Sequence, residues 1–278
     1  MSDLAALIPF ETQVAQNLHF ETSDHFFELH HFGFDRLVVT FEDARLPKER
    51  PQRYRQGWGV APFLKRGASI LAVKPKQCHW YSKPDLAAAF AALRPFLAQY
   101  GEVVTYGMSM GGFAALTYAD LLGAARVVAL APQATYRFVG PRRETRFPAS
   151  FDWDHSGPHG DAVTGCKGAE VFILYDRMER TDKWHAGRFQ GGNIHRIALP
   201  YFSHGVPRML LNIGALGMVV DLVLTGELDE LALYRLARQR RDFAQYLTFL
   251  KAKARQHPAH TARVYGLLGE VFDPSARA

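Results

Sequence analysis

The stretch that most constrains the fold of this chain is residues 102–133, which read EVVTYGMSMGGFAALTYADLLGAARVVALAPQ. It begins with a short apolar run at residues 103–106, whose length and β-branched side chains predict a buried strand. A glycine-rich turn follows, and then an apolar pattern typical of a helix, with Gly123 where a helix C-cap belongs. A second apolar run, at residues 126–130, predicts another strand. The stretch therefore predicts a strand, a tight turn, a helix and a strand in direct succession.

The turn has the pattern G-x-S-x-G, centred on Ser109. Between a strand and a helix this pattern indicates a nucleophile elbow, in which glycines permit the sharp turn and the serine hydroxyl stands at the top of the sheet. The free N–H groups of the first helical turn, beginning at Met110, would stabilise a negative charge that develops on a reacting oxygen. The structural alternative is a glycine-rich turn that only packs closely, with Ser109 as a filler.

Alternating strands and helices are the second constraint on the fold. Further strand-like runs occur at residues 37–41, 69–73, 171–175 and 194–199, with helical patterns between them. Apolar strands that alternate with helices are typical of a mostly parallel sheet covered on both faces. A chain of 278 residues, 48% hydrophobic, is long enough to bury one such core. We therefore expect an α/β fold with a mostly parallel, doubly wound sheet.

Two helices were located by their proline and cap residues. Ser82 predicts the N-cap of one helix, which Pro95 is expected to bend near its end. The longest apolar run, residues 209–224, is short for a membrane span and contains polar residues, so it predicts a buried helix that begins at Pro207. The sequence thus predicts no membrane span. The first residues also lack the features of a signal peptide.

Composition argues against several classes of function. The net charge of +6 is moderate and no nucleic-acid-binding motif accompanies it, so no nucleic-acid partner is expected. Two cysteines without metal or redox spacing, Cys78 and Cys166, favour a reducing compartment and a cytoplasmic location. We expect His25, His30 and His31 to lie on strand faces rather than to bind a metal. Dinucleotide, P-loop and zinc-protease motifs are absent from the sequence, so no cofactor is expected.

Residues 134–168 have no regular period and are long for a connection inside a compact domain, which is typical of a lid or a binding loop. They carry five aromatic residues and four arginines. Arg142, Arg143 and Arg146 are candidate ligands for a carboxylate or phosphate of the substrate, because guanidinium binds such groups through two parallel hydrogen bonds. The alternative is an irregular surface segment whose arginines pair with surface acids.

The chain changes in character near residue 226. We expect residues 1–225 to form the α/β domain and residues 226–278 to form a small helical appendage. From residue 227 on, nine Lys and Arg oppose six Asp and Glu, and no strand pattern occurs. This basic helical tail could pack on the domain or dock a protein partner.

The ordered strands, the GMSMGG turn at residues 107–112 and a histidine after the last strand resemble the α/β-hydrolase superfamily, over roughly residues 36–224. That superfamily places its chemistry in the chain order Ser, Asp or Glu, His. The resemblance implies that Ser109 is the nucleophile and that His204, in PYFSHGVP, is the general base. It also implies that no cofactor is needed. A purely structural role for His204 remains the alternative.

The sequence leaves the acid open among three residues. Asp182 is preferred, because the superfamily acid normally lies a little past the strand end, in the loop. Asp176, at the strand end, is the alternative, and Glu179 is third. Asp176 could instead bind loop amides, and Asp182 could be only an N-cap. Whichever residue serves, it would accept the His204 Nδ1–H and stabilise the imidazolium.

The oxyanion loop departs from the superfamily pattern. In place of glycines, the segment after the early strand reads TFED at residues 40–43. The oxyanion hole would then comprise the Met110 N–H and a backbone N–H near Glu42. The carboxylates of Glu42 and Asp43 would disfavour a negative charge beside them unless they turn outward.

The resemblance implies a serine hydrolase that cleaves an ester or thioester through an acyl-enzyme, or transfers the acyl group to another acceptor. The expected substrate is a small acyl ester or thioester, anionic if the arginines bind it. The alternative is a non-catalytic binding or scaffold protein on a degenerate hydrolase fold, with the helical tail as its docking element.

Overall fold

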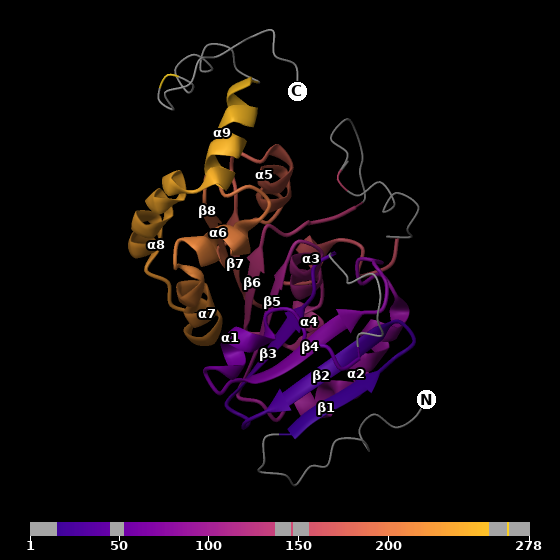
Figure 1. Ribbon diagram of the computed structural model, residues 1–278. Coiled ribbons are helices and arrows are strands. Elements are labelled where there is room, and N and C mark those ends of the chain that lie inside the picture. The colour runs from indigo at the N-terminus through magenta and orange to yellow at the C-terminus, as the bar shows by residue number, and fades with distance from the viewer. Residues whose placement is uncertain (1–15, 45–52, 137–145, 147–155, 256–265, 267–278) are drawn as a thin grey trace.

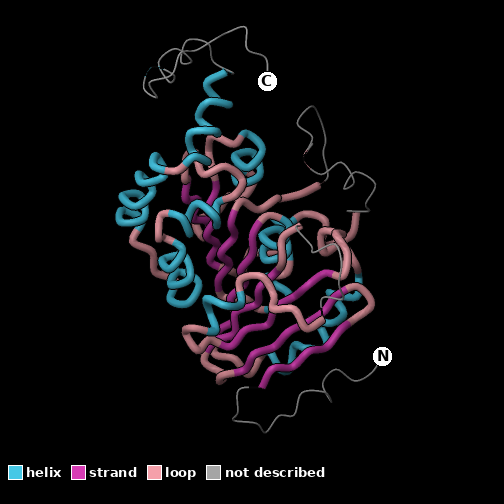
Figure 2. Tube along the Cα trace, viewed as in Figure 1, coloured by secondary structure: helices cyan, strands magenta, loops and turns pink. Residues whose placement is uncertain are grey.

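A computed structural model describes residues 16–44, 53–136, 146, 156–255 and 266 of the chain (Figure 1). In the described part, eight strands form one sheet in the order β1-β2-β4-β3-β5-β6-β7-β8. The strands are β1 (Gln16–Glu21), β2 (His25–His31), β3 (Arg36–Phe41), β4 (Ser69–Pro75), β5 (Glu102–Met108), β6 (Arg126–Leu130), β7 (Glu170–Tyr175) and β8 (Ile194–Ala198). Figure 2 shows these strands as a twisted sheet with helices on either side.

The sheet is mostly parallel, as expected. β1 pairs with β2, and β2 with β4, in antiparallel register, and every other neighbouring pair is parallel. The chain runs from β3 outward to β4 and then returns to β5 on the other side of β3. In open α/β sheets, ligands bind outside the carboxyl ends of the strands at such a reversal. The G-x-S-x-G turn directly follows β5 and therefore lies at this edge.

Helices cover both faces of the sheet, because side chains on the central strands are buried on both sides. On β3, Leu37, Val39 and Phe41 belong to one buried cluster, while Val38 belongs to the other. The first face packs against α2 (Pro84–Leu97), α3 (Met110–Thr117), α4 (Ala119–Leu122) and α5 (Arg180–Gly187). The second packs against α1 (Val60–Leu64), α6 (Val206–Asn212), α7 (Leu216–Thr225) and α8 (Glu230–Ala237). The doubly wound α/β architecture is thus confirmed.

Two local features differ from the sequence expectation. The strand β1 was not predicted, because it is an edge strand and its sequence QNLHFE lacks an apolar run. Ser82 does not cap α2, since Lys83 is the N-cap residue and the Ser82 hydroxyl donates to the His79 carbonyl at 2.7 Å. Pro95 does lie inside α2, which ends two residues later.

The apolar run at residues 209–224 is two helices rather than one. α6 ends at Asn212, and Gly214 adopts a positive φ of 71° before α7 begins at Leu216. No single helix among the described residues has the length and hydropathy to cross a membrane. α6 and α7 pass that test only as a pair, and their axes are bent by 114°.

The C-terminal helices pack on the domain over part of their length. In α8, Leu233 and Ala237 are buried in the same cluster as α6 and α7. α9 (Ala244–Arg255) follows a short 3-10 turn and extends from the body of the domain in Figure 1. Residues 256–265 and 267–278 of the expected helical appendage lie outside the described residues.

Candidate active site

The expected elbow is formed between β5 and α3. Ser109 has a φ of 53° and a ψ of −118°, a backbone conformation that costs a non-glycine residue on the order of 1–3 kcal/mol. Its N–H donates to the Leu130 carbonyl on β6 at 2.9 Å, which ties the turn to the sheet. The flanking glycines are required sterically. A Cβ at Gly107 would lie 2.2 Å from the carbonyl oxygen of Gly111, and a Cβ at Gly111 would lie 2.2 Å from that of Phe41.

Ser109, His204 and Asp182 meet at the carboxyl edge of the sheet. The Ser109 hydroxyl lies 2.9 Å from His204 Nε2, and His204 Nδ1 lies 3.0 Å from both carboxylate oxygens of Asp182. Ser109 is 4% exposed and the Asp182 side chain is fully buried, whereas the His204 side chain is 25% exposed. The Ser109 hydroxyl can therefore transfer its proton to a base that a buried carboxylate orients.

The structure separates the roles of the two candidate aspartates. Asp176 does not contact the histidine ring. Its carboxylate accepts three backbone N–H groups, from Met178 at 2.7 Å, Tyr201 at 3.0 Å and Ser203 at 2.7 Å. Burial raises the pKa of Asp176, and these hydrogen bonds oppose the rise. Asp176 thus fixes the loop that carries His204, while Asp182 reaches the ring from α5. Glu179, the third candidate, is the N-cap residue of α5.

Gln133, which the sequence interpretation did not single out, contacts the serine directly. Its amide Nε2 donates to the Ser109 hydroxyl oxygen at 3.1 Å, and its side chain is completely buried. The signal in the sequence was a polar residue just past the end of the buried strand β6, beside the elbow. The Gln133 carbonyl oxygen lies farther away, 3.5 Å from the Ser109 oxygen, whereas His204 Nε2 lies 2.9 Å from it. Gln133 accordingly gives the hydroxyl a donor, and His204 is the nearer acceptor for the hydroxyl hydrogen.

Arg146 reaches the same group of side chains. Its NH1 atom lies 2.8 Å from Asp182 Oδ1 and 3.0 Å from His204 Nδ1. The sequence had placed Arg146 among three candidate substrate ligands. The other two, Arg142 and Arg143, lie outside the described residues, as does most of the expected lid at residues 134–168.

The backbone N–H of Glu42, at the expected oxyanion loop, does not face Ser109. The Glu42 N–H is directed at the Val73 carbonyl on β4, at 3.4 Å, and therefore continues the sheet rather than facing the serine. Its carbonyl accepts the Tyr81 hydroxyl at 3.0 Å. Met110 is the first residue of α3, so its N–H belongs to the free first turn, as expected. The Glu42 amide is thus not the second donor, because it is committed to β4.

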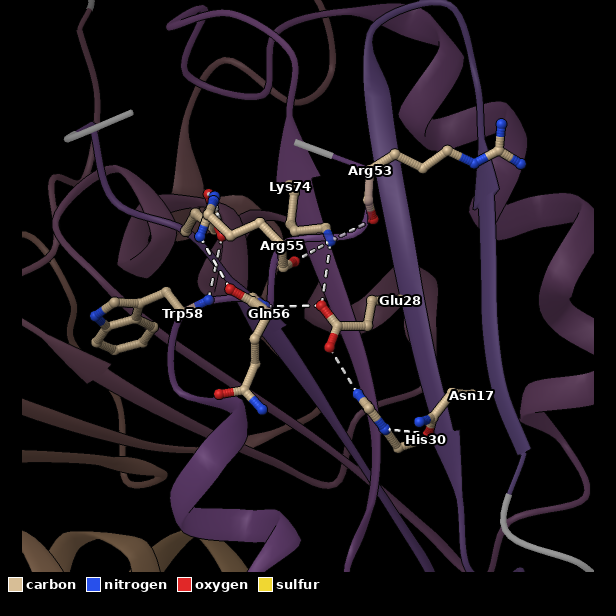
Figure 3. A network of polar contacts seen from close by, with 10 residues as sticks. Asn17, Glu28, His30, Arg53, Arg55, Gln56, Trp58 and Lys74 are labelled. Carbon is tan, nitrogen blue, oxygen red and sulfur yellow. Dashed lines mark hydrogen bonds and ion pairs between the residues drawn. The ribbon is translucent and has the colours of Figure 1, made fainter. Parts of the chain in front are cut away.

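The Glu42 carboxylate is neutralised rather than left beside the site. Arg55 NH2 donates to its two oxygens at 2.7 and 2.6 Å, and the Trp58 N–H donates to one of them at 3.2 Å. Figure 3 shows Arg55 and Trp58 on the same connecting segment, residues 53–58. Arg55 therefore compensates the negative charge of Glu42 that the sequence suggested would disfavour an oxyanion.

A buried ion pair holds that connecting segment. Lys74, on β4, has no exposed side-chain surface and contacts Glu28 on β2 at 3.1 Å (Figure 3). Its ammonium also donates to the carbonyls of Arg53 and Arg55 at 2.9 and 2.6 Å. Burial lowers the pKa of Lys74, and the charge of Glu28 opposes that effect. The pair therefore anchors to the sheet the segment that places Arg55 against Glu42.

The three histidines expected on strand faces each have a side-chain partner. His25 contacts Asp85 at 3.1 Å, His30 contacts Glu28 at 2.6 Å, and His31 contacts the Tyr100 hydroxyl at 2.7 Å. Within the described ranges, no cluster of three or more His, Cys, Asp or Glu side chains could hold a metal ion.

Comparisons with known proteins identify the fold. No protein-family model matches the chain, and no curated protein sequence matches it. The capsule O-acetyltransferase of Neisseria meningitidis serogroup A is structurally similar, with a TM-score of 0.52 and 13% identity, over 76% of this chain and 98% of that one. Carboxyl esterase 2 of the mycorrhizal fungus Tuber melanosporum has a TM-score of 0.51 and 11% identity, over 83% and 88% of the two chains.

A third similar structure is an esterase from Pyrobaculum calidifontis, with a TM-score of 0.50 and 10% identity, over 75% of this chain and 83% of the esterase. All three identities are too low to carry more than the fold. The fold is one that esterases and an acetyltransferase share, and the chain covers most of the length of each.

Proposed function

We propose that this chain, which has the α/β-hydrolase fold, is a serine hydrolase that cleaves an ester or thioester through an acyl-enzyme. The observation that carries the proposal is the continuous series of contacts from Asp182 to His204 Nδ1 and from His204 Nε2 to the Ser109 hydroxyl. A buried acid, an orienting contact and a nucleophile within hydrogen-bond reach are what such chemistry requires.

In the proposed first step, the Ser109 oxygen attacks the acyl carbon while its proton passes to His204 Nε2. The Asp182 carboxylate holds the Nδ1–H and stabilises the imidazolium that forms. The negative charge on the acyl oxygen is stabilised by the Met110 N–H at the start of α3. The imidazolium then returns its proton to the leaving group, and the acyl-enzyme remains.

In the second step, His204 takes a proton from a water molecule as the water oxygen attacks the acyl carbon. The bond between the acyl carbon and the Ser109 oxygen then breaks, His204 returns the proton to that oxygen, and the acid is released. The Gln133 amide keeps the serine oxygen oriented through both steps, because it donates to that oxygen and not to the base. Asp176 contributes by holding the backbone of the His204 loop. No other group needs to enter the reaction.

Acyl transfer to an alcohol acceptor is the second candidate function. Its support is the structural similarity to a capsule O-acetyltransferase, which covers 98% of that chain. The same three side chains serve both reactions, because only the nucleophile of the second step differs. Product analysis with and without an added polyol separates them: transfer yields an acylated polyol, and hydrolysis yields the free acid alone.

The test of the proposal is steady-state turnover of p-nitrophenyl esters by the wild type, Ser109→Ala and His204→Ala. Each substitution is expected to lower kcat by about a thousandfold or more. Ser82→Ala is the matched control, because the Ser82 hydroxyl donates to the His79 carbonyl at 2.7 Å and not to a residue of the proposed mechanism. Full activity in Ser109→Ala would contradict the proposal, and a folded wild type without turnover would favour the scaffold alternative.

A further inference from the structure

Arg146 occupies a position that the proposed mechanism does not use and that opposes it. A guanidinium has only hydrogen-bond donors, and its NH1 atom lies within 3.0 Å of His204 Nδ1. In the reactive tautomer, Nδ1 carries a hydrogen and points it at Asp182. Two donors then face each other between Arg146 and His204, so the arginine contact disfavours this tautomer.

The same contact favours the other tautomer. If Nδ1 has no hydrogen, it accepts the Arg146 N–H, and the hydrogen is on Nε2. Nε2 then donates to the Ser109 oxygen at 2.9 Å and cannot accept the serine proton. The arginine therefore stabilises a form of His204 that does not activate the nucleophile.

Arg146 also competes for the charge of the acid. It lies 2.8 Å from Asp182 Oδ1, in an ion pair whose carboxylate is fully buried. An imidazolium at His204 is stabilised by that carboxylate, and a guanidinium already bound to the same oxygen reduces the stabilisation. Both effects of Arg146 act against the first step of the reaction.

Arg146 is one of the two side chains of this group that a substrate can reach. Among these four residues, Ser109 and Asp182 are buried, while the side chains of Arg146 and His204 are each 25% exposed. A quarter of the Arg146 side chain is therefore accessible from solvent, and its NH1 atom lies 3.0 Å from the histidine that contacts Ser109. An anionic group on a substrate can compete with Asp182 for the Arg146 guanidinium.

We infer, resting on the proposed function, that Arg146 is a specificity residue that restrains His204 until a carboxylate or phosphate group of the substrate binds the guanidinium. The substrate class is then an acyl ester or thioester with an anionic group beyond the acyl carbon. Such a substrate binds Arg146 and at the same time leaves Asp182 to His204 alone. A neutral ester does not draw Arg146 away from Asp182 and His204, and it is therefore turned over more slowly.

The experiment compares p-nitrophenyl valerate with mono-p-nitrophenyl glutarate, whose acyl chain replaces the terminal methyl group with a carboxylate. For the wild type, kcat/KM is expected to be higher for the glutarate. In Arg146→Ala, turnover of the valerate is expected to rise, and the glutarate-to-valerate ratio to fall by about tenfold or more, as for a lost hydrogen bond to a charged group. In parallel, the ¹⁵N chemical shifts of His204 are expected to move toward the Nδ1–H tautomer.

Arg188→Ala is the matched control. Arg188 is also a partly exposed arginine paired with an aspartate, Asp161, at 2.7 Å, so its removal changes the net charge equally. The ratio is expected to stay at its wild-type value in this variant. Thermal melts establish that both variants are folded.

Slower turnover of both esters by the same factor in a folded Arg146→Ala would overturn the inference, because Arg146 would then only support Asp182. Equal effects of Arg146→Ala and Arg188→Ala on the ratio would also overturn it, since general charge would explain the preference. The proposed function fails separately, if wild-type Ser109 does not react with either ester.

Discussion

The carboxylate of Asp176 accepts the backbone N–H of Ser203 at 2.7 Å, one residue before His204. Ser203 has a positive φ of 57°, and Tyr201, whose N–H binds the same carboxylate, has a φ of 65°. Asp176 therefore holds a strained loop in the conformation that brings His204 to Ser109. The ring of His204 is oriented separately, by Asp182.

These two roles predict different effects of the same substitution. Asp182→Asn is expected to lower kcat by about a thousandfold or more, because the amide no longer stabilises the imidazolium or fixes the tautomer. Asp176→Asn is expected to lower kcat less than Asp182→Asn does. It is also expected to lower the free energy of unfolding by about 1–3 kcal/mol, because an NH₂ group replaces one of the two oxygens that together accept three backbone N–H groups. Kinetics and chemical denaturation of both variants measure this, and the reverse ranking in kcat would refute the assignment of the acid.

The pairing of Arg55 with Glu42 predicts an electrostatic effect at the oxyanion loop. Arg55→Ala leaves the Glu42 carboxylate, 4% exposed as a residue, without its guanidinium partner. An uncompensated negative charge beside a developing oxyanion is expected to lower kcat by about tenfold or more, with a smaller effect on KM. Steady-state kinetics on a neutral ester measures the change.

The double variant Glu42→Gln Arg55→Ala distinguishes charge from structure. If charge is the cause, the double variant is expected to recover to within about threefold of Glu42→Gln alone. Arg53→Ala is the control, because Arg53 lies on the same segment but pairs with the exposed Glu21 at 3.1 Å. Failure of the double variant to recover would mean that Arg55 only holds the segment in place.

His79 predicts a loss of stability in acid. Burial, followed by the charge of His25, lowers its pKa from 6.5 to about 4, although Asp24 and Asp85 oppose the decrease. A lowered pKa in the folded state means that stability present above pH 6.5 is lost as the pH falls toward 4, since only the unfolded chain takes up the proton there. The loss from this residue is on the order of 3 kcal/mol.

Urea denaturation of the wild type and His79→Gln, at pH 7 and near pH 4, measures this contribution. Glutamine keeps an N–H for the Asp24 carbonyl, which the histidine Nε2 approaches at 3.4 Å, and does not titrate. The variant is expected to lose less stability than the wild type over the same pH range. Identical losses in the two proteins would show that His79 does not carry the pH dependence.

Much of the fold was accessible from the sequence, because it is encoded locally. The strands β3 to β7 contain apolar runs, and the elbow combines a strand, glycines and a helix within a short stretch. The edge strand β1 was missed because its pattern is polar and its partner β2 supplies the pairing. The break between α6 and α7 was missed because the apolar character continues across Gly214.

The candidate site was accessible only in part. Ser109 and His204 follow from the motif and from the position after the last strand, but the spacing along the chain could not decide between Asp176 and Asp182. That choice depends on how far α5 reaches toward His204, which is a property of the tertiary structure. The contacts of Gln133 and Arg146 with the site likewise join segments far apart in sequence.

The most direct test of the central claim is to label the wild-type protein with a fluorophosphonate and to map the adduct by mass spectrometry. This probe captures a serine only where a base activates it and donors bind the resulting oxyanion. We expect one adduct, on Ser109, and none in Ser109→Ala or His204→Ala. An unlabelled wild-type protein that is shown to be folded, or an adduct that persists in Ser109→Ala, would contradict it.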